Sequence, residues 1–75
     1  YKMSEIKTLT KINSSMLYAV GYAPKAEILE VVFNRGKIWR YYDVPLSVYE
    51  GLLTTRSVGS YMNSHVIDCY EDEPV

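Results

Sequence analysis

The 75-residue sequence contains few residues that bring covalent or metal chemistry, with a single cysteine, Cys69, and a single histidine, His65. One cysteine excludes an internal disulfide, and no metal-ligand spacing exists. We therefore expect no metal, no cofactor and a reducing, cytoplasmic location. No apolar run approaches the length of a membrane span, and no charged-then-apolar leader with a cleavage site is visible, so we expect no membrane partner.

The chain is short and its charge is unevenly distributed. A single domain of this size buries only about 60% of its unfolded surface, so self-association would help to stabilise it. The net charge of −1 argues against a generally basic nucleic-acid binder. However, residues 1–40 carry seven Lys and Arg against three Glu, whereas residues 41–75 carry Arg56 alone against six Asp and Glu. This split permits a local basic patch or head-to-tail contacts between copies.

Residues 28–45 predict a β-hairpin, because two β-rich segments flank an Asn-Arg-Gly turn. A three-residue loop over 34–36, with Gly36 in the left-handed region, sets Phe33 against Lys37, Val31 against Trp39, Leu29 against Tyr41 and Glu30 against Arg40. A two-residue loop would instead set Val31 against Arg40 and turn the second strand over. We predict the three-residue loop.

An alternating pattern predicts a strand over 14–22, with Met16, Tyr18, Val20 and Tyr22 on one side and Ser15, Leu17, Ala19 and Gly21 on the other. A turn over 23–27 joins it to the hairpin. Residues 1–13 are expected to form an N-terminal arm, as a short helical turn or a frayed end. The chain begins with Tyr1, so it is either a fragment or starts naturally at Met3, and we favour the second.

Two helices are predicted after the sheet. Pro45 ends the last strand, and Ser47 with Glu50 matches a capping box at the start of the first helix. This helix frays at 54–55, and its apolar face carries Val48, Tyr49, Leu52 and Leu53. Ser57 is a second candidate cap, before a helical stripe of Val58, Tyr61, Met62, His65, Val66 and Cys69. Gly59 in the first turn either lets another backbone approach closely or is merely exposed.

This order predicts an α+β fold, a three-stranded antiparallel meander followed by two helices packed on one face of the sheet. Residues 14–70 would form the single domain and residues 71–75 a solvated acidic tail. The helix-facing side would carry Leu29, Val31, Phe33, Trp39 and Tyr41. The opposite face, with Ile28, Glu30, Val32, Ile38, Arg40 and Tyr42, is too apolar to stay wholly in water. We therefore predict a homo-oligomer whose interface contains Ile28, Val32, Ile38 and Tyr42.

Candidate ligand-binding residues follow from charge and position. They are Arg35 and Lys37 at the turn, Arg40 and Tyr42 on the open sheet face, and Arg56 beside the second helix. The alternative for each is an ordinary solvated side chain or, for Arg40, a cross-strand pair with Glu30. Trp39 and Tyr41 could stack on bases. Because they face Val31 and Leu29 across the hairpin, a core position is the better interpretation.

No catalytic constellation is visible. His65 and Cys69 are four residues apart on the predicted helical stripe, but a general acid or base also needs a nucleophile or carboxylate at the right geometry. A histidine at the edge of an apolar stripe and a lone cysteine that behaves as a small hydrophobe are the plainer interpretations. We predict that the protein is not an enzyme.

Several short motifs together resemble the KTSC domain, named after the C-terminus of some lysyl-tRNA synthetases. They are Ser14-Ser15, Gly21-Tyr22, Leu29/Val31/Phe33, Gly36, Trp39/Tyr41, Val44-Pro45 with Val48-Tyr49, Ser57/Gly59 and Asn63. The match spans about residues 14–70. The resemblance implies a small domain that also occurs alone in bacterial and phage proteins, with RNA binding as its suggested role.

The sequence departs from this family in two places. The central Tyr-x-Tyr reads Trp39-Arg40-Tyr41, and the basic residues that usually follow Asn63 are replaced by residues 66–69, Val-Ile-Asp-Cys. The second change weakens the case for RNA. We expect a small non-catalytic binding module with RNA or a nucleotide as ligand. One alternative is a phage-type protein that sequesters a host nucleotide signal at a subunit interface, an analogy that rests on size and on the family's distribution. The other is a pure protein–protein interaction module.

Overall fold

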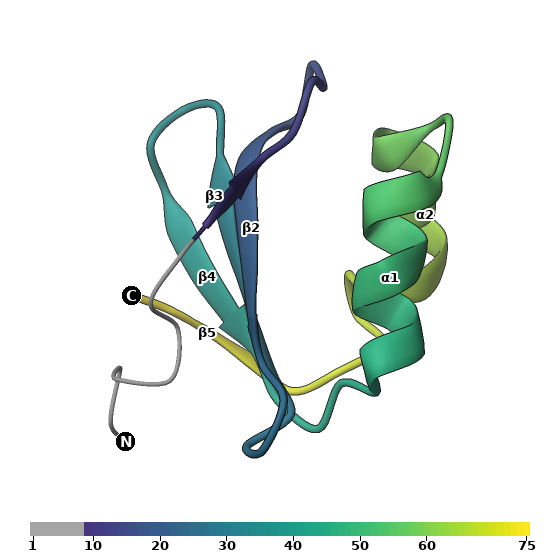
Figure 1. Cartoon of the computed structure of the whole chain (residues 1–75). Coiled ribbons are helices and arrows are strands. Elements are labelled where there is room, and N and C mark those ends of the chain that lie inside the picture. The colour runs from purple at the N-terminus through teal and green to yellow at the C-terminus, as the bar shows by residue number, and fades with distance from the viewer. Residues whose placement is uncertain (1–8) are drawn as a thin grey trace.

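The computed structural model describes residues 9–75 and shows an antiparallel sheet with two helices on one face (Figure 1). The predicted α+β class and the placement of the helices are confirmed. The sheet has five strands in the order β1-β2-β3-β4-β5. The predicted three-stranded meander is therefore its centre, and the strand count was wrong.

The hairpin formed by β3 (Ile28–Phe33) and β4 (Ile38–Tyr41) has the predicted register. Glu30 lies opposite Arg40, and Val31 lies opposite Trp39. Gly36 has a φ of 90°, a conformation that L side chains rarely adopt, and its N–H donates to the carbonyl of Phe33. The three-residue loop is confirmed.

The strand β2 (Leu17–Ala23) contains an irregularity that its sequence does not reveal. Leu17 lies opposite Phe33 but Ala19 lies opposite Val32, so Tyr18 is an extra residue in the ladder. Leu17 therefore shares the helix-facing side with Val20, and both belong to the core. The simple alternation predicted for residues 14–22 was wrong at this point.

Two short strands complete the sheet at its edges. The strand β1 (Thr10–Lys11) pairs with β2, in a region expected to be an arm, and residues 1–8 of that arm lie outside the described residues. The acidic segment expected as a solvated end contains β5 (Asp72–Pro74). Its side chains are exposed, but its backbone pairs with β4. The strand order places β5 at the opposite edge of the sheet from β1.

The helix α1 (Leu46–Thr54) begins two residues earlier than the predicted cap at Ser47 requires. Pro45 is the residue before the helix, with a φ of −65°, and no side chain caps it. Ser47 is already inside the first turn, so the predicted capping box was wrong. The helix ends at Thr54, as predicted.

The helix α2 (Val58–His65) is shorter than its apolar stripe. Ser57 precedes it, but makes no capping hydrogen bond through its side chain. Beyond His65 the chain turns, and Asp68 takes a φ of 62°. Met62 and Val66 are fully buried, whereas Cys69 is exposed because it follows the turn.

The glycine at a close contact is Gly51 on α1, rather than Gly59. A Cβ built on Gly51 would lie 2.0 Å from the Tyr61 hydroxyl oxygen, whereas a Cβ on Gly59 would have no neighbour within 4 Å. Of the two possibilities left open for Gly59, the close approach of another backbone was wrong.

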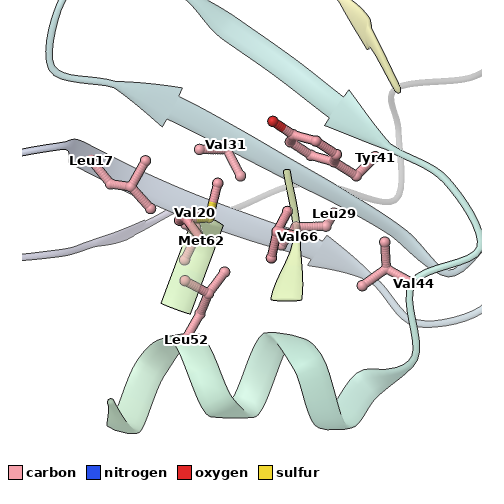
Figure 2. Packing of buried hydrophobic residues seen from close by; sticks show 9 residues of the cluster. All are labelled: Leu17, Val20, Leu29, Val31, Tyr41, Val44, Leu52, Met62 and Val66. Carbon is pink, nitrogen blue, oxygen red and sulfur yellow. The ribbon is translucent and has the colours of Figure 1, made fainter. Parts of the chain in front are cut away.

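The core lies between the sheet and the helices. Figure 2 shows nine of its residues, with Leu52 projecting from α1 toward the sheet. They are Leu17, Val20, Leu29, Val31, Tyr41, Val44, Leu52, Met62 and Val66. Phe33 and Trp39 are only partly buried against this cluster. Their remaining surface faces the end of the hairpin.

Candidate functional site

An open hollow of about 530 Å³ lies at the turn end of the β3–β4 hairpin. Figure 1 shows this turn and the loop before β2 at the same end of the sheet. The lining combines two aromatic rings, a methionine, two cations and two polar residues, namely Phe33, Trp39, Met16, Arg35, Lys37, Ser15 and Asn34. Its volume falls within the range of roughly 300–1,000 Å³ that is usual for small-molecule sites.

Asn34 holds the two sides of this hollow together. Its side-chain amide donates to the carbonyl of Ser14 at 2.8 Å, and its backbone N–H donates to the carbonyl of Met16 at 3.0 Å. The Ser14 hydroxyl in turn accepts hydrogen bonds from the backbone N–H groups of Met16 and Leu17. These bonds fix the loop before β2 against the hairpin turn, so Met16 forms a defined wall.

The aromatic surface comes from the last residue of β3 and the second residue of β4. Phe33 and Trp39 are both half-buried, so each ring is anchored by the core on one side and accessible on the other. The sequence favoured a core position for Trp39, and the structure shows it packed against the core but only partly buried. Tyr41, only 3% exposed, belongs wholly to the core. A rigid, partly exposed indole is suited to stacking on a flat ligand.

The cations of the hollow are Arg35 and Lys37, both exposed and separated by Gly36. Within residues 9–75, no carboxylate lines the hollow. The net positive charge of the first half of the chain is therefore partly placed at this aromatic surface. A guanidinium and an ammonium group at one rim favour an anionic ligand.

A second hollow, of about 510 Å³, lies on the other side of the start of β4. Its lining includes Lys37 and Trp39 again, together with Gly36, Ile38, Pro74 and Val75. It exists because β5 ends alongside Trp39, and the N–H of Val75 donates to the carbonyl of Ile38 at 2.8 Å.

The other predicted ligand residues do not gather at this site. Arg40 is only 6% exposed, and its Nε donates to Glu30 Oε1 at 2.9 Å, which is the cross-strand pair weighed as the alternative. The hydroxyl of Tyr42 donates to the carboxylate of Glu73. Arg56 is exposed in the link between the helices. The structure therefore brings together Arg35 and Lys37, and separates them from the other three.

The predicted interface residues differ in exposure. Ile28 is only 4% exposed, so it offers little surface to a partner. Val32 and Ile38 lie opposite one another in the register and are half-buried, on the face away from the helices, and Tyr42 is also half-buried. Val32 and Ile38 are the apolar pair that this face presents.

His65 and Cys69 form no combined site. The centre of the His65 ring lies 4.5 Å from that of Tyr61, with the two rings tilted by 43°, and the Cys69 thiol lies 3.6 Å from the carbonyl of Ser64. Both residues are exposed, so the expected apolar surroundings of Cys69 were wrong. Between residues 9 and 75, no three His, Cys, Asp or Glu side chains are placed to share a metal ion. In the same part of the chain, neither helix is long and apolar enough to cross a membrane.

Sequence reasoning missed Met16, Ser15, Phe33 and Asn34 as site residues. Phe33 was expected among the core residues, and Met16 was expected on a strand rather than a loop. The signal that could have pointed to Asn34 is its place at the start of the turn, where a side-chain amide commonly bonds to nearby backbone. Its partner Ser14 is twenty residues away, so the contact has no local pattern.

Comparison with known proteins gives two similar chains of comparable length. An uncharacterized protein of Stutzerimonas stutzeri is 42% identical over 52 residues, which are 69% of this chain and 73% of that protein. A protein of Tsukamurella paurometabola is 38% identical over 55 residues, 73% of this chain and 82% of that protein.

A larger enzyme contains a similar segment. A lysine–tRNA ligase of Nostoc sp. is 34% identical over 58 residues, 77% of this chain but only 10% of the ligase. Among solved structures, the crystal structure of a KTSC domain protein from Yersinia pestis matches with a TM-score of 0.88. The match covers 91% of this chain and 96% of that one at 19% identity, so it shows a shared fold. The KTSC domain model matches residues 13–70. The chain belongs to the KTSC domain family.

Proposed function

We propose that this protein is a small non-catalytic binding module whose ligand is a nucleotide or a nucleotide unit of RNA, held in the hollow at the hairpin end. The observation that carries the proposal is the combination of Phe33 and Trp39 with Arg35 and Lys37 in one lining. A base stacked on an aromatic side chain contributes about 1–3 kcal/mol. A phosphate beside the two cations adds charge-assisted hydrogen bonds.

The absence of a histidine or carboxylate base from the described lining supports a binding role over a catalytic one. Among residues 9–75, the lining of the hollow contains no histidine, cysteine or carboxylate. His65 and Cys69 belong to α2 and the turn after it. The Ser15 hydroxyl and the Lys37 ammonium group are the lining groups that could act as nucleophiles, and the lining offers neither of them a histidine or carboxylate as a general base.

Trp39 makes the proposal directly measurable because it is the sole tryptophan of the sequence. Titration with AMP or UMP, with excitation where tyrosine does not absorb, should quench its fluorescence along a saturable curve. An unchanged emission spectrum over the whole titration, with no ligand binding by calorimetry, would rule out a nucleotide at this site.

Matched variants of three exposed cations test the role of charge in binding. Arg35→Ala and Lys37→Ala should each weaken binding, whereas Arg56→Ala, an exposed cation outside the site, should leave affinity unchanged. Affinity should fall between about 50 and 200 mM salt, because a phosphate contact displaces counterions. Equal losses in Arg35→Ala and Arg56→Ala would mean that binding follows overall charge instead of this hollow.

We also propose that copies of the chain associate through the sheet face that carries Val32 and Ile38, and that the protein works in the cytoplasm. The half-buried apolar pair on that face supports association. A cysteine with no second cysteine in the sequence supports a reducing location. If the protein instead sequesters a nucleotide signal, the ligand would be a free nucleotide in the same hollow, whereas in RNA binding it would be one unit of a longer strand.

A further inference from the structure

The two hollows at the hairpin end are adjacent and share part of their lining. Their volumes are about 530 Å³ and about 510 Å³, and both include Lys37 and Trp39. Each hollow alone has the volume of a small-molecule site. Lys37 and Trp39 are therefore the residues that the two linings share.

The register places the hollows on opposite sides of the start of β4. On the β3 side, the N–H of Phe33 donates to the carbonyl of Lys37 at 2.8 Å, and Phe33 lines the first hollow. On the β5 side, Pro74 lies opposite Trp39 and lines the second. Two apolar surfaces thus flank one cation.

We infer that the site takes a dinucleotide-sized ligand, with one base in each hollow and the linking phosphate at Lys37. The inference rests on the proposed function and specifies its ligand. A base is flat and largely apolar on its faces, so it suits Phe33 and Trp39 on one side and Pro74 and Val75 on the other. The phosphate between two bases carries the charge that Lys37 complements.

The acidic residues set a limit to the length of the ligand. Beyond Pro74, β5 continues into Glu73 and Asp72, and Asp72 lies opposite Tyr41. A further phosphate in this direction would approach carboxylates and be repelled. The arrangement therefore favours two nucleotides over a strand that continues along β5.

Three ligands distinguish the possibilities, namely AMP, the dinucleotide ApA with one phosphate, and the tetranucleotide of the same base. ApA should bind at least about tenfold more tightly than AMP, although AMP carries more charge, and the tetranucleotide should gain less than about tenfold over ApA. Binding of AMP with no gain for ApA would overturn the inference and leave the proposed function standing. No binding of any of the three would overturn both. A tetranucleotide that binds far more tightly than ApA would overturn the limit of two.

A proline variant tests the second hollow separately. The double variant Pro74→Ala/Val75→Ala should lose most of the advantage of ApA over AMP, to less than about threefold. Pro24→Ala, at an exposed proline in the β2–β3 turn, is the matched control and should keep the advantage. Melting curves check that each variant is folded. A folded double variant that still prefers ApA tenfold would show that Pro74 and Val75 contact no second base.

Discussion

The hydroxyl of Tyr61 on α2 donates a hydrogen bond to the carbonyl oxygen of Val48 on α1, at 3.1 Å, and the ring of Tyr61 lies against Gly51. His65, one turn later on α2, contacts the same ring in a tilted arrangement, with ring centres 4.5 Å apart. The missing side chain of Gly51 is what allows the tyrosine to reach the backbone of α1. The two helices therefore pack through a tyrosine and a glycine.

Gly51→Ala should destabilise the domain. The added Cβ would lie 2.0 Å from the hydroxyl oxygen and 2.5 Å from the ring carbon that carries it, so Tyr61 must move and lose its bond to Val48. Overpacking costs about 1–3 kcal/mol, more than the gain of about 1 kcal/mol from replacing a helical glycine. The midpoint of chemical denaturation should therefore fall.

Gly59→Ala is the control because its Cβ would have open space. This change should raise the free energy of unfolding by up to about 1 kcal/mol, through helix propensity alone. The midpoint of chemical denaturation should rise accordingly. If both alanine variants are equally stabilised, Tyr61 moves aside without cost and its contact with Gly51 has no energetic role.

The sequence predicted the hairpin register because two independent signals agree there. Gly36 marks the left-handed position, and only the three-residue loop sets Glu30 against Arg40 and Val31 against Trp39. The extra residue Tyr18 in β2 has no such signal, since it interrupts a plausible alternation without a glycine or proline. A one-residue shift of this kind moves every earlier side chain to the other face.

The edge strands and half of the site escaped prediction for a related reason. The side chains of β1 and β5 are exposed, so their pairing depends on backbone hydrogen bonds that leave no apolar pattern. Arg35 and Lys37 were found from the turn itself. Met16 reaches the hollow through the long-range bonds of Asn34, which sequence periodicity cannot show.

The ion pair between Glu30 and Arg40 should be structural. Both residues are 6% exposed, and Arg40 Nε lies 2.9 Å from Glu30 Oε1. Arg40→Ala would leave the Glu30 carboxylate buried without this partner, at a cost of about 3–5 kcal/mol. Thermal melting should show a large loss of stability or an unfolded chain.

A double variant separates this role from ligand binding. Glu30→Val/Arg40→Met removes both charges and should recover most of the stability, since a buried pair can be replaced by apolar residues at little cost. The folded double variant should bind nucleotide with unchanged affinity, because Arg40 does not line the hollows. Lost affinity in this folded variant would place Arg40 in the binding site after all.

Stability should fall at alkaline pH through Tyr41. Burial raises the pKa of Tyr41 to about 12, and the nearby carboxylates of Asp72 and Asp68 add to this effect. Because the pKa in the folded state lies above the unfolded value of about 10, the folded chain holds the proton more tightly. The stabilisation of the folded state that follows from this pKa difference is fully present below about pH 10 and is lost as the pH rises toward about 12.

Tyr41→Phe tests the assignment. Its unfolding midpoint should decline less between about pH 10 and 12 than that of the original protein. Burial also raises the pKa of Tyr22, with help from Glu27, so some decline should persist in the variant. An identical decline in both proteins would show that Tyr41 ionises in the folded state as it does in the unfolded one.

Val32→Glu or Ile38→Glu should dissociate the proposed oligomer. The two side chains lie opposite one another on the sheet face away from the helices, and neither belongs to the main core cluster. A carboxylate at either position would have to be desolvated when two such faces meet, which costs several kcal/mol. Sedimentation velocity at high micromolar concentration should show an assembly for the original chain and monomers for both variants.

The control for this experiment is Leu53→Glu, the same kind of change at an α1 residue that is 43% exposed. It should leave the assembly intact, because Leu53 lies on the helical side of the domain. A strict monomer in the original chain would refute association altogether. Assembly retained in both sheet variants, but lost in Leu53→Glu, would move the interface from the sheet to the helices.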